Sequence, residues 1–282
     1  MTETLTARRL PSLATAGLAA ALALAAPGDA PRADGLIPLE DDGWRFVIAP
    51  YAFLPLLTDV ESGLGGVSTE ATIWMDDLLE NLNMAFAGRG EAWYDRFGVT
   101  VDGYYASLDG GGRSSLGPGP FTLNADIESD QSYVTFLGGY RVLQTEWQPG
   151  RGLAVDLMAG ARWNRLVQDV DFRLSAGVGP GRVRSIGGNA VWWEPVIGAR
   201  IGAAVAEDWT LGMRAEFGGF GAGGDNLQWH VLLGADYAIT ESISLRAGWQ
   251  FYGIDFEADA KLGRFRLNLF QTGPYLAAAF RF

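Results

Sequence analysis

The sequence predicts an all-β chain that closes into a single antiparallel transmembrane β-barrel of about ten strands. The first observation is a period-two alternation of apolar and polar residues, because successive side chains leave a strand on opposite faces. The second is a composition of 39 Gly, 10 Trp, 9 Tyr and 15 Phe, which favours strands and turns over helices. The third is the content of the two faces, since one is almost wholly apolar and the other carries charges of both signs.

The N-terminal segment predicts export. Arg8 and Arg9 precede an Ala- and Leu-rich run from Leu10 to Ala26, and small residues follow it. We therefore expect residues 1–33 to be a signal peptide for the Sec pathway and residues 34–282 to form one barrel domain. The run falls short of the roughly 20 strongly apolar residues that a membrane-spanning helix needs, and no later stretch reaches that length. Residence in a membrane would therefore require a closed barrel.

Turn-forming residues divide the mature chain into alternating segments. We expect strands at 44–53, 83–94, 97–108, 120–141, 152–173, 182–206, 209–219, 226–239, 242–257 and 264–282. Eight or twelve strands are the alternatives, because the region 55–82 is ambiguous. Within it, Trp74, Leu78, Leu79 and Leu82 fall at helical spacing and predict a short amphipathic helix in the first long loop.

The two faces of the strands differ in chemistry. Residues such as Trp193, Leu211 and Trp249 belong to the apolar parity, which we expect to face lipid. The opposite parity supplies a candidate lumen charge network, which consists of Arg89, Asp102, Asp156, Arg162, Glu194, Arg200, Arg214, Glu216 and His230. The alternative is a secreted soluble barrel or sandwich with the apolar face inward and the charges outward.

Tight turns fix which residues of a hairpin lie opposite each other. A turn at Asp95 and Arg96 places Arg89 opposite Asp102. A loop centred on Val178 pairs Arg162 with Glu194, and by the same register Asp156 with Arg200. A barrel of about eight strands has room only for side chains or one small ligand, so we expect a filled lumen. A narrow path for protons, ions or a small solute is the alternative reading.

The last twelve residues, QTGPYLAAAFRF, form an alternating aromatic segment that ends in Phe280 and Phe282. In this respect the chain resembles the bacterial outer-membrane β-barrels, whose final strand closes the barrel and whose terminal Phe is read by the barrel-assembly machinery. The resemblance extends over nearly all of the mature chain. It implies residence in the outer membrane, contact with lipid and lipopolysaccharide, and an assembly signal at Phe280 and Phe282. These features are shared by barrels with different activities, so they indicate location rather than function.

Catalytic chemistry finds little support in the sequence. His230 is the only histidine, and the positions two residues away are Gln228 and Leu232. The family of outer-membrane lipid hydrolases has a His and a Ser two residues apart on one strand face, so this chain does not resemble it at that motif. His230 and the distant Asp236 also do not match the Asp/His arrangement of outer-membrane proteases. The chain has no Cys, which removes thiol nucleophiles, thiolate metal sites and disulfides.

The charge balance narrows the partners. A net charge of -12 argues against nucleic acid. The acidic groups Asp76–Asp77 and Asp126, Glu128 and Asp130 are expected to be solvated loop residues, although they could bind divalent cations that bridge lipopolysaccharide. We expect a monomer without cofactor or metal centre. The first functional hypothesis is a non-enzymatic structural or surface-display protein, the second a narrow pore, and the third a lipid-modifying enzyme.

Overall fold

The computed structural model describes residues 43–64, 67–115, 121–148, 151–176, 182–222, 225–260 and 263–282. The expected signal peptide, residues 1–33, lies outside them. Within the described residues the chain forms twelve strands and one short helix. Their bounds are β1 Trp44–Phe53, β2 Leu57–Leu64, β3 Val67–Trp74, α2 Met75–Asn81, β4 Leu82–Tyr94, β5 Phe97–Ser115, β6 Phe121–Gln148, β7 Arg151–Ala176, β8 Arg182–Ala204, β9 Trp209–Gly218, β10 Asp225–Ala238, β11 Ile243–Ala260 and β12 Gly263–Arg281.

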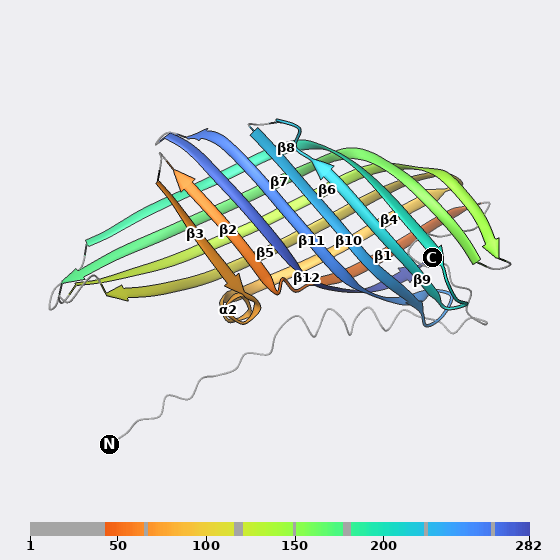
Figure 1. Cartoon of the computed structure of the whole chain (residues 1–282), viewed down its shortest axis with the longest axis horizontal. Helices are drawn as coiled ribbons and strands as arrows, with labels where there is room; N and C mark the ends of the chain where they lie inside the picture. The colour runs from red at the N-terminus through yellow and green to blue at the C-terminus, as the bar shows by residue number, and fades with distance from the viewer. Residues whose placement is uncertain are drawn as a thin grey trace, which may run out of the picture.

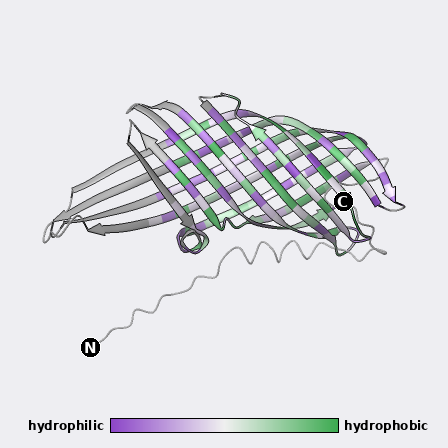
Figure 2. Ribbon diagram, in the orientation of Figure 1, coloured by the Kyte–Doolittle hydropathy of each residue, from purple (hydrophilic) through white to green (hydrophobic). Residues whose placement is uncertain are grey.

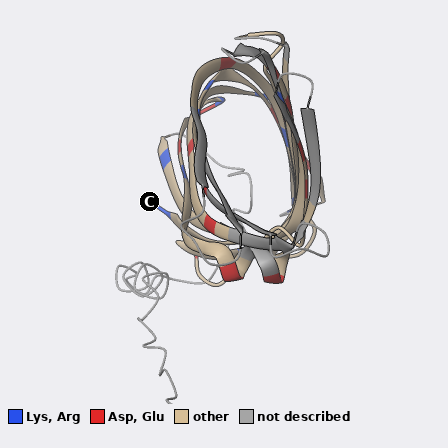
Figure 3. Cartoon of the chain, turned by 90° about the vertical axis from the view of Figure 1, so that its left-hand side faces the viewer, with Lys and Arg blue, Asp and Glu red and all other residues tan. Residues whose placement is uncertain are grey.

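Ten of these strands close a barrel (Figure 1). Strands β1 and β4 to β12 pair with their neighbours in an antiparallel sheet, and pairing of β1 with β12 joins its two ends. Seen end-on, the strands enclose an oval outline (Figure 3). The expected antiparallel barrel of ten strands is therefore confirmed. Strand β5 runs to Ser115 rather than ending at residue 108, because residues 109–115 pair with residues 122–128 of β6 despite their glycines. Strands β6 and β7 also end later than expected, at Gln148 and Ala176, whereas β8 ends two residues earlier, at Ala204.

The ambiguous region 55–82 forms an additional hairpin and a helix. Strand β2 pairs with β12 beyond the end of β1, and β3 returns beside β2 before α2 leads into β4. Between β1 and β2 the ladder is carried by isolated bonds, since the Leu54 and Leu56 amides donate to the carbonyls of Pro274 and Thr272 at 3.0 and 2.9 Å. The short helix expected in the first long loop is confirmed as α2.

No helix in the described part of the chain is long and apolar enough to cross a membrane.

Short turns gather at the end of the barrel where the C-terminus lies. The Arg141 amide donates to the Arg96 carbonyl at 2.8 Å, and the Ala238 amide donates to the Asp208 carbonyl at 2.9 Å. The Arg281 amide donates to Ser242 at 2.8 Å, which joins the closing strand to the β10–β11 turn. At the opposite end the long strands β5 to β8 extend away from the barrel body (Figure 1).

The apolar parity faces outward, as expected. Trp193, Leu211 and Trp249 are 56, 49 and 39 % exposed, whereas the alternate positions of the same strands are largely buried. Bands of apolar residues cross the barrel wall in Figure 2. Trp209 and Phe217 lie eight residues apart on β9, about 27 Å along a strand and about 21 Å across a membrane at a tilt of about 40°. That height is close to the apolar band of outer-membrane barrels, so the soluble alternative with its apolar face inward is wrong.

Exposed aromatic side chains flank this apolar band near the short turns. Trp44 packs against Tyr94, and Phe97 packs against Tyr140, with ring centroids 5.4 and 5.1 Å apart. Amphipathic rings are favoured at the boundary between hydrocarbon and water, because they have an apolar body and, in Trp and Tyr, a polar group. These pairs therefore mark one edge of the lipid-facing belt.

Candidate functional site

The interior of the barrel contains a dense set of buried charges. Among the described residues, each member of this set has at most 7 % of its surface exposed. The set, here called the lumen charge network, consists of the arginines Arg89, Arg141, Arg162, Arg200, Arg214 and Arg246, the carboxylates Glu91, Asp102, Asp156, Glu194, Glu216 and Asp236, and His230. It contains all nine residues expected from the sequence, and Figure 3 shows charged positions along the strands. The six arginines and six carboxylates of this described network balance in formal charge.

The three ion pairs expected from hairpin register are present. Arg89 Nε donates to Asp102 Oδ2 at 2.6 Å. Arg200 NH2 lies 2.8 Å from Asp156 Oδ2, and Arg162 NH1 lies 3.5 Å from Glu194 Oε1. Each pair joins neighbouring strands at the register position that the turns impose. Neighbouring strands thus hold each other through the side chains as well as through the backbone.

A second group of contacts joins strands that are not adjacent, and sequence reasoning missed it. Arg162 NH2 donates to Glu216 Oε2 at 2.6 Å, although a whole strand separates β7 from β9. Arg200 NH1 donates to Glu91 Oε2 at 2.7 Å, from β8 to β4. Such contacts depend on closure of the barrel and on the length of the side chains. Hairpin register predicts only which residues of adjacent strands lie opposite each other. These contacts connect strands that are not adjacent, and Arg200–Glu91 also connects opposite walls of the barrel.

Trp93 fills the lumen at the end nearer the short turns. The guanidinium carbons of Arg141 and Arg200 lie 5.1 and 5.2 Å from the centre of its ring, within the range of cation–π attraction. The indole N–H donates to Glu91 at 3.1 Å. Gly98 leaves the space that the ring occupies, because a Cβ there would lie 2.3 Å from it. The tryptophan is fully buried, and its ring contacts both guanidinium groups.

Polar side chains continue the network toward the opposite end. Asn226 donates to Glu194 at 2.9 Å. In the amide orientation that satisfies its neighbours, Gln228 donates to Glu194 and accepts from Tyr252, and it also accepts from Arg162 at 3.1 Å. These bonds satisfy polar groups that would be costly to bury alone.

His230 lies within this polar layer. It is paired across the sheet with Glu216 on β9 and with Tyr252 on β11, whose ring meets its imidazole edge-on at 6.4 Å. Its Nε2 has no hydrogen-bond partner in the described part of the chain. The side chain is buried, so its immediate surroundings are protein rather than bulk water.

An apolar layer, also missed by the sequence analysis, covers the polar layer. It is formed by Ile254, Phe256 and Leu267 with Leu166 and Trp192, and the rings of Trp192 and Phe256 stack at 4.8 Å. These residues come from β7 and β8 on one side and from β11 and β12 on the other. The available signal was that the parity of β11 that carries Arg246 and Gln250 becomes apolar at Tyr252, Ile254 and Phe256. The lumen is therefore filled by charged, polar and apolar layers in succession.

The acidic groups expected in loops lie instead in regular elements, Asp76 and Asp77 in α2 and Asp126, Glu128 and Asp130 in β6. No group of three His, Cys, Asp or Glu residues suited to a metal occurs in the described ranges. The side chains of Asp77 and Asp126 lie outside the described residues, whereas Tyr105 donates to Asp130 at 3.3 Å.

Comparisons with known proteins support the fold. No protein-family model matches the chain, and no curated protein sequence is significantly similar to it. The crystal structure of the outer membrane protease OmpT from Escherichia coli superposes with a TM-score of 0.55 at 13 % identity, covering 85 % of this chain and 96 % of that chain. OprG from Pseudomonas aeruginosa and Ail from Yersinia pestis also match, at 11 and 10 % identity and TM-scores of 0.33 and 0.30. They cover 90 and 86 % of this chain and 98 and 100 % of theirs.

The closed antiparallel sheet, the outward apolar belt and the likeness to OmpT define the class of protein. The chain has the fold of a Gram-negative outer-membrane β-barrel. At 13 % identity this likeness concerns the fold alone.

Proposed function

We propose that the protein is a non-enzymatic barrel of the outer membrane, whose filled lumen has a structural role and whose extended strands β5 to β8 serve surface display. It reaches the membrane after export through the Sec pathway and is inserted as a monomer by the barrel-assembly machinery, with Phe280 and Phe282 as the signal. Lipid surrounds the apolar belt, and lipopolysaccharide surrounds the end of the barrel opposite the short turns.

The observation that carries this proposal is the double closure of the lumen. The ion pairs join strands that are not adjacent, since Arg200–Glu91 links β8 to β4 across the lumen and Arg162–Glu216 links β7 to β9 past β8. The apolar layer around Trp192 and Phe256 lies next to them. An ion that crossed the lumen would have to separate buried ion pairs and then lose its hydration in an apolar constriction.

Single-channel recording in a planar bilayer tests the closed lumen. We expect the refolded protein to give no discrete openings. As a matched control that shows insertion, the double variant Trp192→Ala, Arg162→Ser removes one side chain from each layer, and we expect it to leak ions. Discrete openings of the unmodified protein would instead support the narrow pore.

An enzymatic role for His230 finds no support in its surroundings. Its neighbours across the sheet are Glu216 and Tyr252, neither of which is a serine or cysteine nucleophile. Asp236 is six residues away on the same strand, about 20 Å at the usual rise per residue. A hydrolase activity that disappears in His230→Ala, in a variant that still folds, would contradict the non-enzymatic assignment.

A further inference from the structure

The hydrogen bonding of the barrel wall is interrupted where β1 ends. Strand β4 pairs with β1 only as far as Ala87, which lies opposite Tyr51. Beyond that point the connection 54–56 bonds to β12 and not to β4. Residues 82–86 of β4 therefore pair with β5 on one side and, in the described structure, with no strand on the other. This interruption between 54–56 and 82–86 is here called the wall break.

The helix α2 lies at the wall break in place of a strand (Figure 1). It connects the end of β3 to the first residue of β4. The helix has seven residues, and no side chain caps its N-terminus. A helix of this length is marginal by itself, so α2 closes the wall less firmly than a hydrogen-bonded strand would.

A pocket, here called the α2 pocket, lies at the wall break. Leu54 and Pro55 line it from one side of the break, and Leu82 and Ala85 line it from the other. Leu79 of α2 is also part of the lining and is 44 % exposed. Apolar side chains that remain partly open to solvent are a cost that an apolar occupant would remove.

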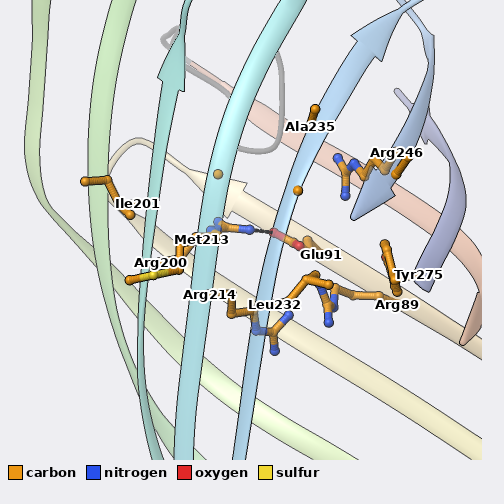
Figure 4. A pocket seen from close by; sticks show the side chains of 13 residues that line it. Arg89, Glu91, Arg200, Ile201, Met213, Arg214, Leu232, Ala235, Arg246 and Tyr275 are labelled. Carbon is orange, nitrogen blue, oxygen red and sulfur yellow. Dashed lines mark hydrogen bonds and ion pairs between the residues drawn. The ribbon is translucent and has the colours of Figure 1, made fainter. Parts of the chain in front are cut away.

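The lining of the α2 pocket is uncharged. Its polar side chains, among the described residues that line it, are Tyr104, Ser129, Gln131 and Gln271, and the others are apolar. The space between the arginines of β4, β8, β9 and β11 is different (Figure 4). It has room for about one water, and each of its guanidinium groups contacts a carboxylate. A charged ligand would find no partner in the α2 pocket, whereas a neutral and mostly apolar one is favoured.

The outer side of the same segment of β4 belongs to the lipid-facing belt. Met84 and Phe86 are 48 and 62 % exposed, and the ring of Phe86 stacks on that of Tyr105 at 5.3 Å. Phe86 lies eight residues from Tyr94 on β4, the same separation that spans the belt on β9. The Phe86–Tyr105 pair thus marks the edge of the belt away from the short turns. Because side chains alternate along a strand, the α2 pocket and the lipid interface are separated only by β4.

We propose that the α2 pocket binds the alkyl chain of a neutral single-chain amphiphile, which enters from the membrane interface through the wall break. The enclosed space is about 60 Å³, and one water needs about 10–15 Å³, so the end of a narrow chain fits whereas a bulky ring system does not. The uncharged polar group of the ligand can bond to the amides of Gln131 or Gln271. This site requires a membrane location, but it does not depend on closure of the lumen or on surface display.

Photolabelling tests the proposal with the full chain in phosphatidylcholine vesicles and an octanol that carries a diazirine. After irradiation, mass spectrometry identifies the labelled residues. We expect labelling within 104–108 and 129–131, which form the luminal side of the pocket, and excess unlabelled octanol should suppress it. Labelling of the outward belt should persist, because partition into lipid is not saturable. Ionised octanoate of the same chain length should compete less well, since no cation lines the pocket.

The variant Ala85→Trp tests the position of the site. Ala85 is exposed and lines the pocket, so a large ring there should fill the space and lower pocket labelling severalfold. The matched control is Ala52→Trp, which makes the same change at an exposed position of β1 that is not part of the lining. This control should be labelled in the pocket as the unmodified protein is.

Competition by octanol uses the unmodified protein, so the test remains decisive should Ala85→Trp not fold. The proposal is overturned if residues 104–108 and 129–131 are not labelled, or if unlabelled octanol does not suppress their labelling. An equal loss of pocket labelling in Ala52→Trp would also overturn it. Equal competition by octanoate would show that the site does not select a neutral ligand, contrary to the proposal.

Discussion

Arg162 shows how much of the interior can depend on one side chain. Its guanidinium contacts Glu194 and Glu216, its Nε donates to Thr135 at 2.8 Å, and it lies 5.4 Å from the centre of the Tyr133 ring. Changing Arg162→Met keeps most of the volume but leaves two buried carboxylates with fewer partners. We expect the free energy of unfolding to fall by about 3–5 kcal/mol, the usual effect of breaking a buried ion pair. Urea unfolding of the refolded protein in micelles, followed by tryptophan fluorescence, measures this loss.

Arg266 provides the control for this experiment. Its side chain is 57 % exposed and pairs with Glu257 outside the lumen charge network. Because solvent screens such a pair, Arg266→Gln should leave the unfolding midpoint unchanged. Equal midpoints for the Arg162 and Arg266 variants would show that the network does not stabilise the barrel.

The sequence predicts these residue contacts only in part. Arg89–Asp102 and Arg162–Glu194 join adjacent strands, so the position of a turn is enough to pair them. Arg200–Glu91 joins residues 109 positions apart through the lumen. That contact depends on how the closed barrel brings β4 and β8 together, and no local turn determines it.

Among the elements, β12 shows where strand prediction reaches its limit. Its alternation is clear in the sequence, whereas the hairpin beside it was ambiguous because β2 and β3, LTDVESGL and VSTEATIW, are short and weakly alternating. Pro55 also interrupts the segment between β1 and β2. The structure resolves the ambiguity by letting β12 pair with β1 through residues 275–281 and with β2 through residues 265–272. The long strand β12 thus pairs with two short strands, β1 and β2, in place of one long partner.

Gly273 lies where β12 changes partner, and its lack of a side chain is required there. A Cβ at this position would lie 2.0 Å from the Leu54 carbonyl oxygen and 2.8 Å from the Leu56 nitrogen. Both are backbone atoms, so the strands would have to separate. We expect Gly273→Ala to lower the free energy of unfolding by about 1–3 kcal/mol, the usual range for overpacking. Urea unfolding in micelles again provides the measurement.

Gly103→Ala is the matched substitution for Gly273→Ala. Gly103 lies within β5, and a Cβ there would meet nothing within 4 Å. This variant should be at least as stable as the unmodified protein, because alanine reduces the conformational freedom of the unfolded chain. A loss of stability as large as that of Gly273→Ala would refute the role assigned to the strand junction.

The terminal residue of β12, Phe282, allows folding and assembly to be tested separately. The Phe282 backbone exchanges hydrogen bonds with Phe46 at 3.0 and 3.2 Å, but its side chain is 69 % exposed. Phe282→Ala keeps the backbone contacts, so we expect unchanged stability of protein refolded in vitro. The amount of barrel inserted in cells should nevertheless fall severalfold if the assembly machinery reads the ring. Equal insertion of both proteins, measured by immunoblotting of outer-membrane fractions, would remove Phe282 from the signal.

For the whole molecule, the sequence predicts which strand face points to lipid and which to the lumen. It does not predict the apolar layer that closes the lumen next to the lumen charge network. Alternation over many strands determines which parity is apolar, and an interior of charges must then be paired. The apolar layer of Trp192, Ile254 and Phe256 instead depends on how the long strands β7, β8 and β11 approach each other beyond the short strand β9. Tertiary arrangement decides the contact between Trp192 on β8 and Phe256 on β11, because these two strands are not sequential neighbours.

The absence of cysteine allows a direct test of the orientation of the whole barrel. Leu211→Cys places a unique thiol on the outward belt, and Glu241→Cys places one in the exposed turn between β10 and β11. With a fluorophore attached and the protein reconstituted in vesicles, nitroxide-bearing lipids should quench the label at position 211 strongly. The label at position 241 should instead be quenched by aqueous iodide, because the turn lies beyond the aromatic pairs that mark the edge of the belt. Strong iodide quenching at position 211 without lipid quenching would mean that the belt faces water, and the membrane-spanning barrel would then be wrong.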